Sequence, residues 1–135
     1  DENFEPDYVF ISNMRRYSKI KNTGTAKIIA TSNIDSKDNV DYLVNYQSYN
    51  CSIEEIADNG GIMALQLLCA LGVREVFIAG MDGYSVNIGD NYYVSTFEAD
   101  QFSPSERRNE LISEVLRDIE RKCKLNFITR TRYVI

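Results

Sequence analysis

The residues best suited to chemistry in this chain lie on either side of one apolar segment. Asn59-Gly60-Gly61 precedes that segment and Asp82-Gly83-Tyr84 follows it. A glycine pair at the start of a helix offers backbone N–H groups at the positive end of the helix dipole, which suit a phosphate or a carboxylate. Asp82 could bind a sugar hydroxyl or act as a base, and Tyr84 offers an aromatic ring face. We therefore expect Asn59, Gly60, Gly61, Asp82 and Tyr84 to bind a ligand.

Each of these features also has a structural interpretation that the sequence leaves open. The glycine pair could mark a kink or a close approach between two helices. Asp82 could order its own turn by accepting hydrogen bonds from backbone N–H groups. No second carboxylate stands near Asp82 in the sequence, so we expect no metal site there. Asp82 is thus the one weak candidate for a catalytic residue.

A second group of candidate contacts lies near the start of the chain. Asn13 follows an apolar strand, and a basic cluster comes directly after it: Arg15, Arg16, Lys19 and Lys21. In an acidic chain such a cluster could hold the phosphates of a nucleotide, so Asn13 and Arg15 join the candidate ligand contacts. The alternative, which we favour for the cluster as a whole, is a solvated helix face.

The amino-acid composition excludes several kinds of catalytic site and partner. The chain has 135 residues, a formal net charge of -5, three cysteines and no histidine. Without histidine it lacks the usual general base at neutral pH, and a Ser-His-Asp or Cys-His site cannot be built from it alone. The negative charge argues against general nucleic-acid binding, and no apolar run is long enough to span a bilayer. Three cysteines without paired spacing fit reduced thiols, so we expect a cytoplasmic protein without a membrane partner.

Strands and helices are expected to alternate along the chain. The apolar patterns predict strands at 8–11, 27–30, 41–46, 76–79 and 125–129, and helices at 14–20, 52–57, 62–71 and from residue 103 onward. This alternation predicts one α/β domain over residues 1–135, a three-layer Rossmann-like fold with a mainly parallel sheet of about five strands. Ligands of such sheets bind at the carboxyl ends of the strands.

Local signals refine these elements. Gly72 is expected to end the central helix in a left-handed conformation. Ser52–Glu55 reads as a capping box, and the continuous apolar run 76–79 predicts a strand covered on both faces. The buried stripe of the last long helix is expected to consist of Leu111, Ile112, Val115, Leu116 and Ile119.

Two regions depart from the regular pattern. Residues 86–102 are polar and aromatic, and they predict either a β-excursion or a lid whose tyrosines could stack on a base. No strand with a phosphate-binding turn precedes Tyr8. We therefore expect an N-terminally truncated domain that is the C-terminal part of a larger enzyme.

Two stretches resemble known families. Residues 59–84 are similar to a pattern of bacterial sialyltransferases and related Rossmann-like domains: small-Gly, apolar helix, Ala-Leu-Gly-x-x-Glu, apolar strand, Gly-x-Asp-x-Tyr. Residues 7–17 are similar to the C-terminal domain that follows the barrel in aldolases of the hydroxymethylglutaryl-CoA lyase and 4-hydroxy-2-oxovalerate aldolase type. The resemblance implies that Asn13, Gly60, Gly61, Asp82 and Tyr84 line a nucleotide-sugar cleft. It also implies an upstream catalytic barrel in the same chain. The catalytic histidine and the Gly-rich loop of the sialyltransferases have no counterpart here.

These observations lead to one expected function and two alternatives. We expect an accessory domain of an aldolase that binds a small anionic ligand, namely a nucleotide, nucleotide-sugar or sugar-phosphate, at the C-terminal edge of the sheet. It would hold no cofactor of its own and would not be catalytic alone. The first alternative is a non-catalytic module of a homo-oligomer, with residues 92–102 and 133–135 at the interface. The second is a sialyltransferase-like glycosyltransferase that uses Asp82 as its base.

Overall fold

The computed structural model describes residues 5–20, 24–35, 38–85 and 105–135, which fall into two compact units. The first unit comprises Asp1–Cys51 and Asp58–Ala64, and the second comprises Ser52–Ala57 and Leu65–Ile135. Each unit has its own parallel sheet. Among the helices of the described residues, none is both long enough and apolar enough to cross a bilayer.

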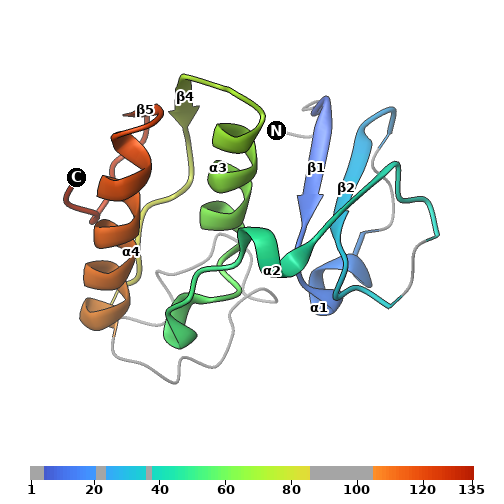
Figure 1. The fold of residues 1–135 in the computed structure, drawn as a ribbon, viewed down its shortest axis with the longest axis horizontal. Coiled ribbons are helices and arrows are strands. Elements are labelled where there is room, and N and C mark those ends of the chain that lie inside the picture. The colour runs from blue at the N-terminus through green and yellow to red at the C-terminus, as the bar shows by residue number, and fades with distance from the viewer. Residues whose placement is uncertain (1–4, 21–23, 36–37, 86–104) are drawn as a thin grey trace. The chain divides into compact units, whose positions relative to one another are not determined.

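The first unit is built on a three-stranded parallel sheet. Its strands are β1 (Tyr8–Ile11), β2 (Lys27–Thr31) and β3 (Tyr42–Val44), in the order β1-β2-β3. Ile11 lies opposite Ala30, and Thr31 lies opposite Val44. All three strands therefore end at the same edge, next to α1 (Met14–Tyr17), toward which the β1 arrow points in Figure 1.

Asparagine side chains start both short helices of this unit. Asn13 accepts a hydrogen bond from the Arg15 amide at 2.8 Å and so caps α1. Asn45 accepts one from the Gln47 amide at 2.9 Å and begins α2 (Tyr46–Tyr49). The prediction of a strand through residue 46 is therefore wrong, because the Asn45 side chain offers the backbone a helical start in place of a ladder partner.

The core of the first unit lies on β1 and β2. Its buried members are Ile11, Ile28, Ala30 and Ile34, and the partly buried Val9, Tyr17, Ile20 and Val40 pack against them. Ala30 is fully buried on the central strand. This small core holds the ends of β1 and β2 in fixed positions.

A carboxylate ties β2 to the segment that leads into β3. The Ile28 amide donates to Asp41 Oδ2 at 2.8 Å, and Lys27 Nζ lies 3.1 Å from Asp41 Oδ1. The backbone hydrogen bond from Ile28, followed by the hydrogen bond from Lys27, holds the pKa of Asp41 below its ordinary value of 3.8. A depressed pKa means that this contribution to stability is present above pH 3.8 and is lost as the pH falls through the folded-state pKa.

Replacing Asp41 with asparagine is accordingly expected to flatten the acid limb of the stability curve. Urea unfolding between about pH 2 and 5 measures it, since the contribution of this group is lost as the pH falls below 3.8. Asp7→Asn, at an exposed carboxylate of the same unit, is the control and should keep the wild-type slope. A variant at Asp41 with the full wild-type acid sensitivity would show that this carboxylate contributes nothing. The effect is small, because both partners are exposed.

The longest apolar helix ends as the sequence predicts. α3 (Gly60–Ala70) begins in the first unit and continues into the second. Gly72 has φ of 87°, its amide bonds to the Cys69 carbonyl, and the Val73 amide bonds to the Leu68 carbonyl. These two bonds form a Schellman motif, in which the left-handed residue is most easily a glycine.

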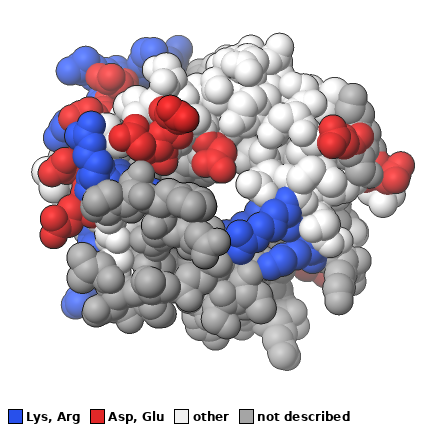
Figure 2. Space-filling model, turned by 90° about the horizontal axis from the view of Figure 1, so that it is seen from below, with Lys and Arg blue, Asp and Glu red and all other residues white. Residues whose placement is uncertain are grey.

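The second unit contains a two-stranded parallel sheet with a helix alongside it. β4 (Glu75–Ile78) pairs with β5 (Lys124–Phe127), and α4 (Ser105–Glu120) runs beside β5 (Figure 1). Along α4, Leu111, Ile112, Leu116 and Ile119 are buried as expected, while Val115 is half-buried. Along α4, Arg107 pairs with Glu110 and Arg121 pairs with Asp118. Figure 2 shows Lys and Arg side chains interspersed with Asp and Glu side chains.

Two expectations for this unit are wrong. Ser52–Glu55 is not a capping box: only a 3₁₀ turn, η1 (Glu54–Ile56), forms there, and its N-cap is Ile53 without a side-chain hydrogen bond. β4 is not covered on both faces, since Phe77 is 67% exposed. Alternate residues of a strand face opposite sides, and β4 buries only the side of Val76 and Ile78.

The α/β class with parallel sheets is confirmed. The described strands form one sheet of three strands and one of two, and a single sheet of about five strands is not shown among them. The predicted β-excursion or lid at 86–102 lies outside the described residues, as do the predicted helix start at 103–104 and Lys21.

Candidate functional site

Small polar residues gather where the strands of the first sheet end. We call this group the polar edge, and it consists of Ser12, Asn13, Thr31, Ser32, Asn33 and Asn45. Each follows or ends a strand, and the parallel register places the three strand ends side by side. The repeated pattern of an apolar run followed by Ser or Asn therefore produces one continuous polar edge.

Hydrogen bonds link the polar edge internally. Thr31 Oγ1 donates to Asn33 Oδ1 at 2.5 Å, and Asn33 Nδ2 donates to the Ser12 carbonyl at 3.0 Å. Thr31 is fully buried and Ser12 nearly so, whereas Asn33 is exposed. The bonds tie the end of β1 to the end of β2, so the edge is held in place before any ligand arrives.

Gly60 lies against this edge. A Cβ atom added to Gly60 would stand 3.3 Å from Ser12 Oγ, closer than most such contacts. Gly60 is not among the glycines with positive φ, so its backbone conformation does not require glycine. Glycine costs about 1 kcal/mol relative to alanine inside a helix. What glycine provides here is close approach of the helix backbone to Ser12.

Asn59 defines the start of α3. Its Oδ1 accepts a hydrogen bond from the Ile62 amide at 3.0 Å, and its carbonyl accepts one from the Met63 amide at 3.0 Å. The amides of Gly60 and Gly61 belong to the first turn, where N–H groups have no acceptor inside the helix. The glycine pair thus begins a helix and does not kink one. It places two N–H donors at the positive end of the dipole beside the polar edge.

Charged side chains of both signs lie in the same unit. Arg15 and Arg16 belong to α1, which Asn13 caps at the polar edge, and Arg15 is exposed. Asp58 is exposed and directly precedes Asn59. Asp58 would repel an anion at the start of α3, and the arginines would attract it. The affinity for an anion therefore depends on both the acidic and the basic side chains.

Asp82 and Tyr84 belong to the second unit and make a separate set of contacts. Thr129 Oγ1 donates to Asp82 Oδ1 at 3.1 Å, and the Asp82 carbonyl accepts from the Arg132 amide at 2.9 Å. The carboxylate therefore bonds a side-chain hydroxyl of the segment after β5, and Asp82 is exposed. The structure brings Asn13, Arg15, Asn59, Gly60 and Gly61 together in one unit and places Asp82 and Tyr84 in the other.

Asn109 and Arg108 hold Tyr84, and no pattern in the sequence indicates either role. Asn109 Oδ1 accepts from the Tyr84 amide and Asn109 Nδ2 donates to the Tyr84 carbonyl, each at 2.8 Å. The Arg108 guanidinium lies 5.2 Å from the centre of the Tyr84 ring. Arg108 is half-buried, and its Nε is buried without a hydrogen-bond partner. One face of the Tyr84 ring is therefore already covered by a cation.

Gly83 sits in a confined turn between these residues. It has φ of 87°, and an added Cβ would lie 2.9 Å from Arg132 Cβ and 3.1 Å from Asn109 Oδ1. Gly83→Ala is expected to cost about 2 to 4 kcal/mol of unfolding free energy, from left-handed strain plus overpacking. Gly80→Ala is the matched control, since Gly80 has φ of 75° but nothing near its Cβ position. Equal losses in the two variants, measured by urea unfolding, would show that the close contacts cost nothing.

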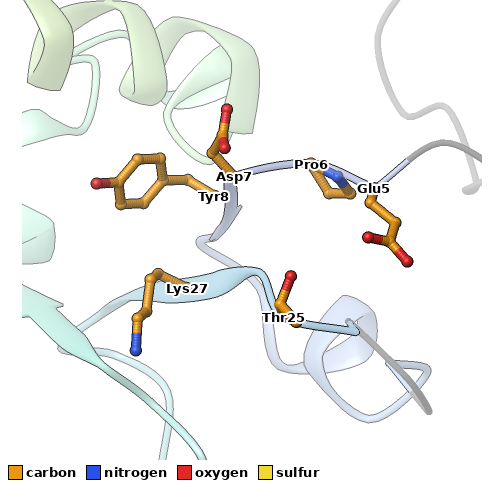
Figure 3. A pocket seen from close by; sticks show the side chains of 6 residues that line it. All are labelled: Glu5, Pro6, Asp7, Tyr8, Thr25 and Lys27. Carbon is orange, nitrogen blue, oxygen red and sulfur yellow. The ribbon is translucent and has the colours of Figure 1, made fainter.

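Surface hollows lie at the opposite end of the first sheet. One of about 410 Å³ is lined by Glu5, Pro6, Asp7, Tyr8, Thr25 and Lys27, at the amino ends of β1 and β2. Figure 3 shows the side chains of Glu5, Asp7 and Lys27 pointing in different directions and not toward one point. The hollow is open, and its polar groups do not converge, so we do not assign it a ligand.

The described residues contain no group of three or more His, Cys, Asp or Glu side chains suited to a metal ion. The polar edge with the start of α3 offers hydrogen-bond donors of the kind that suit an anion. No family model, no curated protein and no solved structure matches the chain.

Proposed function

We propose that this chain is a Rossmann-like domain that binds a nucleotide, nucleotide-sugar or sugar-phosphate at the polar edge of its first sheet. The observation that carries the proposal is the contact distance of 3.3 Å between the Cβ position of Gly60 and Ser12 Oγ. At this distance the start of a long helix lies against the carboxyl ends of parallel strands. Ligands of α/β sheets bind at such ends.

The chemistry of the edge favours a phosphate over a neutral group. The first-turn amides of Gly60 and Gly61 supply donors at a positive dipole end, worth about 0.3 to 2 kcal/mol for an anion. Hydrogen bonds to a charged acceptor add about 1.5 to 3 kcal/mol each. The caps use the Oδ1 atoms of Asn13, Asn45 and Asn59. Each amide group also carries a nitrogen with two donor hydrogens, suited to phosphate or sugar oxygens.

The wider setting of the domain is part of the same proposal. Its parallel strands would belong to a mainly parallel sheet of about five strands in a cytoplasmic protein. An aldolase barrel would lie upstream in the same chain. The resemblance of residues 7–17 to the domain that follows such barrels supports this setting. In that arrangement the domain binds a ligand and the barrel performs the chemistry.

Isothermal titration calorimetry tests the binding directly. Uridine and cytidine diphosphates should release or absorb measurable heat, with Kd in the range of about 10 µM to 1 mM. Uridine and cytidine themselves serve as controls and should bind at least about tenfold more weakly, because they lack the phosphates. Absence of heat with every phosphorylated ligand would refute the proposal.

Removing the negative charge of Asp58 is expected to strengthen phosphate binding. Asp58→Asn keeps the size of the side chain and removes repulsion at the start of α3, so affinity should rise about two- to fivefold at low salt. Asp35→Asn, at another exposed carboxylate of the same unit, should change affinity less. Both are measured by calorimetry at low and high salt. If Asp58→Asn weakened binding, the ligand would be a cation or a hydroxyl group instead.

The oligomerisation alternative is favoured by one observation in the second unit. Phe77, Ile128 and Val134 are 67%, 66% and 70% exposed, so this unit presents apolar side chains that a partner could cover. Light scattering over a range of protein concentrations tests it. A dimer that persists at low concentration and that binds no nucleotide would favour this alternative over ligand binding.

The glycosyltransferase alternative has less support from the geometry. A carboxylate that acts as a general base works best where burial or a like charge raises its basicity. Asp82 is exposed and accepts a hydrogen bond from Thr129 Oγ1. These surroundings suit a carboxylate that holds the segment after β5 in place.

A further inference from the structure

The residue pair at the start of α3 has the sequence most prone to deamidation. Among all asparagines of the chain, Asn59 alone is followed by glycine. In deamidation the backbone nitrogen of the following residue attacks the side-chain carbonyl carbon of asparagine. Glycine has no Cβ atom to shield that nitrogen. Asn59 is therefore the asparagine whose side chain is least protected from this attack.

Two other asparagines cap helices with the same atom but have larger neighbours. The Oδ1 atoms of Asn13, Asn45 and Asn59 accept hydrogen bonds from first-turn amides at 2.8, 2.9 and 3.0 Å. Met14 follows the first of them and Tyr46 follows the second, whereas glycine follows the third. The three side chains thus have similar hydrogen bonds, and the residue that follows is the main difference between them.

The geometry at the start of α3 supplies both partners of the reaction. Gly60 is the first residue of α3, so its N–H group has no acceptor inside the helix. The Ile62 amide donates to Asn59 Oδ1 at 3.0 Å. That hydrogen bond stabilises the negative charge that develops on the oxygen when the carbonyl carbon is attacked. A nitrogen without a helical acceptor therefore lies next to a polarised carbonyl group.

We propose that Asn59 deamidates spontaneously in the folded protein and that the product weakens anion binding at the start of α3. The Gly60 nitrogen bonds to Asn59 Cγ, the bond from Cγ to Nδ2 breaks, and ammonia leaves with the proton of the Gly60 amide. Water then opens the cyclic imide at either of its two carbonyl carbons. The product at position 59 is an aspartate or an isoaspartate. One water is consumed, one ammonia is released, and no electrons are transferred.

The new carboxylate changes the charge of the candidate site without removing the helix. It stands next to Asp58, so two adjacent negative charges precede α3. Aspartate caps a helix about as well as asparagine, so the aspartate product keeps the start of α3. Both products repel a phosphate, and this consequence rests on the proposed function. Conversely, a phosphate that accepts a hydrogen bond from the Gly60 amide occupies the attacking nitrogen, so a bound nucleotide should slow the reaction.

Peptide mapping of the full chain tests the deamidation without any ligand. The protein is incubated at mildly alkaline pH, checked for its fold by circular dichroism, and digested at intervals for mass spectrometry. The peptide that contains Asn59 should gain about 1 Da, because OH replaces NH2, and should separate into two chromatographic forms. The peptides that contain Asn13 and Asn45 should stay unchanged over the same period. Equal rates at the three asparagines, or modification of Asn59 only after unfolding in urea, would overturn the proposal.

Alanine substitutions of the two glycines identify the attacking nitrogen. Gly60→Ala should slow the reaction at least about tenfold, since the added Cβ shields that nitrogen. Gly61→Ala adds the same methyl group one residue further on and should keep a rate close to that of the wild type. Equal slowing in both variants would contradict attack by the Gly60 nitrogen. The wild-type map does not depend on how these variants fold.

Calorimetry with uridine diphosphate tests the effect on binding. Asn59→Asp reproduces the charge of the product and should lower the affinity about two- to fivefold at low salt. Saturating uridine diphosphate should slow the deamidation of the wild type. An affinity of Asn59→Asp equal to that of the wild type would overturn the effect on binding. Absence of heat with the wild type would refute the proposed function and this effect together, while the peptide map decides the deamidation by itself.

Discussion

Replacing Gly60 with leucine is expected to lower the affinity for a nucleoside diphosphate by at least about tenfold while leaving the protein folded. The Cβ position already stands 3.3 Å from Ser12 Oγ, so a leucine side chain would fill the space between helix and edge. Leucine is a better helix former than glycine by roughly 0.8 kcal/mol, which offsets part of the crowding cost. Calorimetry measures the affinity, and urea unfolding checks the fold.

Ala70→Leu is the matched control for this variant. Ala70 is exposed at the opposite end of the same helix, so the substitution adds similar bulk without approaching the polar edge. Its affinity should equal that of the wild type. Equal affinities of Gly60→Leu and Ala70→Leu would mean that the ligand, if it binds at all, does not occupy the space beside Ser12.

Replacing Leu116 with alanine is expected to destabilise the protein by about 2 to 5 kcal/mol. Leu116 is completely buried on α4. Its truncation removes apolar contacts and leaves a cavity that the surrounding helices and strands fill only in part. The melting temperature should fall by roughly 10 °C, as expected for a loss of about 3 kcal/mol in a domain of this size.

Glu114→Ala controls for the loss of a side chain on the same helix. Glu114 is exposed, so its truncation should change the unfolding free energy by no more than about 0.5 kcal/mol. Thermal and urea unfolding followed by circular dichroism measure both variants. A loss below about 1 kcal/mol for Leu116→Ala would show that α4 is not packed as the structure has it.

The sequence predicted those features that depend on neighbouring residues. Asn13 and Gly72 act within one helical turn of their own position, so residue type alone indicates the N-cap and the Schellman end. Tyr8–Ile11 and the buried stripe of α4 follow from periodicity in the same way. The sequence also placed polar residues after each strand, and the parallel register then aligned them.

Features that depend on distant partners were missed or mistaken. Phe77 reads as a buried strand residue, but the number of strands beside β4 decides its exposure, and no local pattern encodes that number. Tyr84 is held by Asn109, which lies on another helix and carries no special pattern. At Asn45 the chain starts a helix instead of continuing the strand, because hydrogen bonding by the Asn45 side chain competes with strand pairing.

The close approach of Gly60 to Ser12 also combines features that the sequence indicates with a contact that it does not indicate. The sequence identified the glycine pair as the start of a helix suited to an anion, and it identified small polar residues after β1. It grouped the pair with Asp82 and Tyr84 as contacts of one ligand. The structure shows contact with Ser12 within the first unit, so the proposed site rests on that unit alone.

Backbone NMR of the isotopically labelled chain during titration with uridine diphosphate tests the central claim most directly. We predict that the amide resonances of Gly60 and Gly61 shift at the lowest ligand concentrations and by the largest amounts, together with those of the polar edge. Uridine, which lacks phosphates, should leave the two glycine amide resonances unshifted. Saturable shifts that spare Gly60 and Gly61 and fall elsewhere in the chain would contradict an anion site at the start of α3.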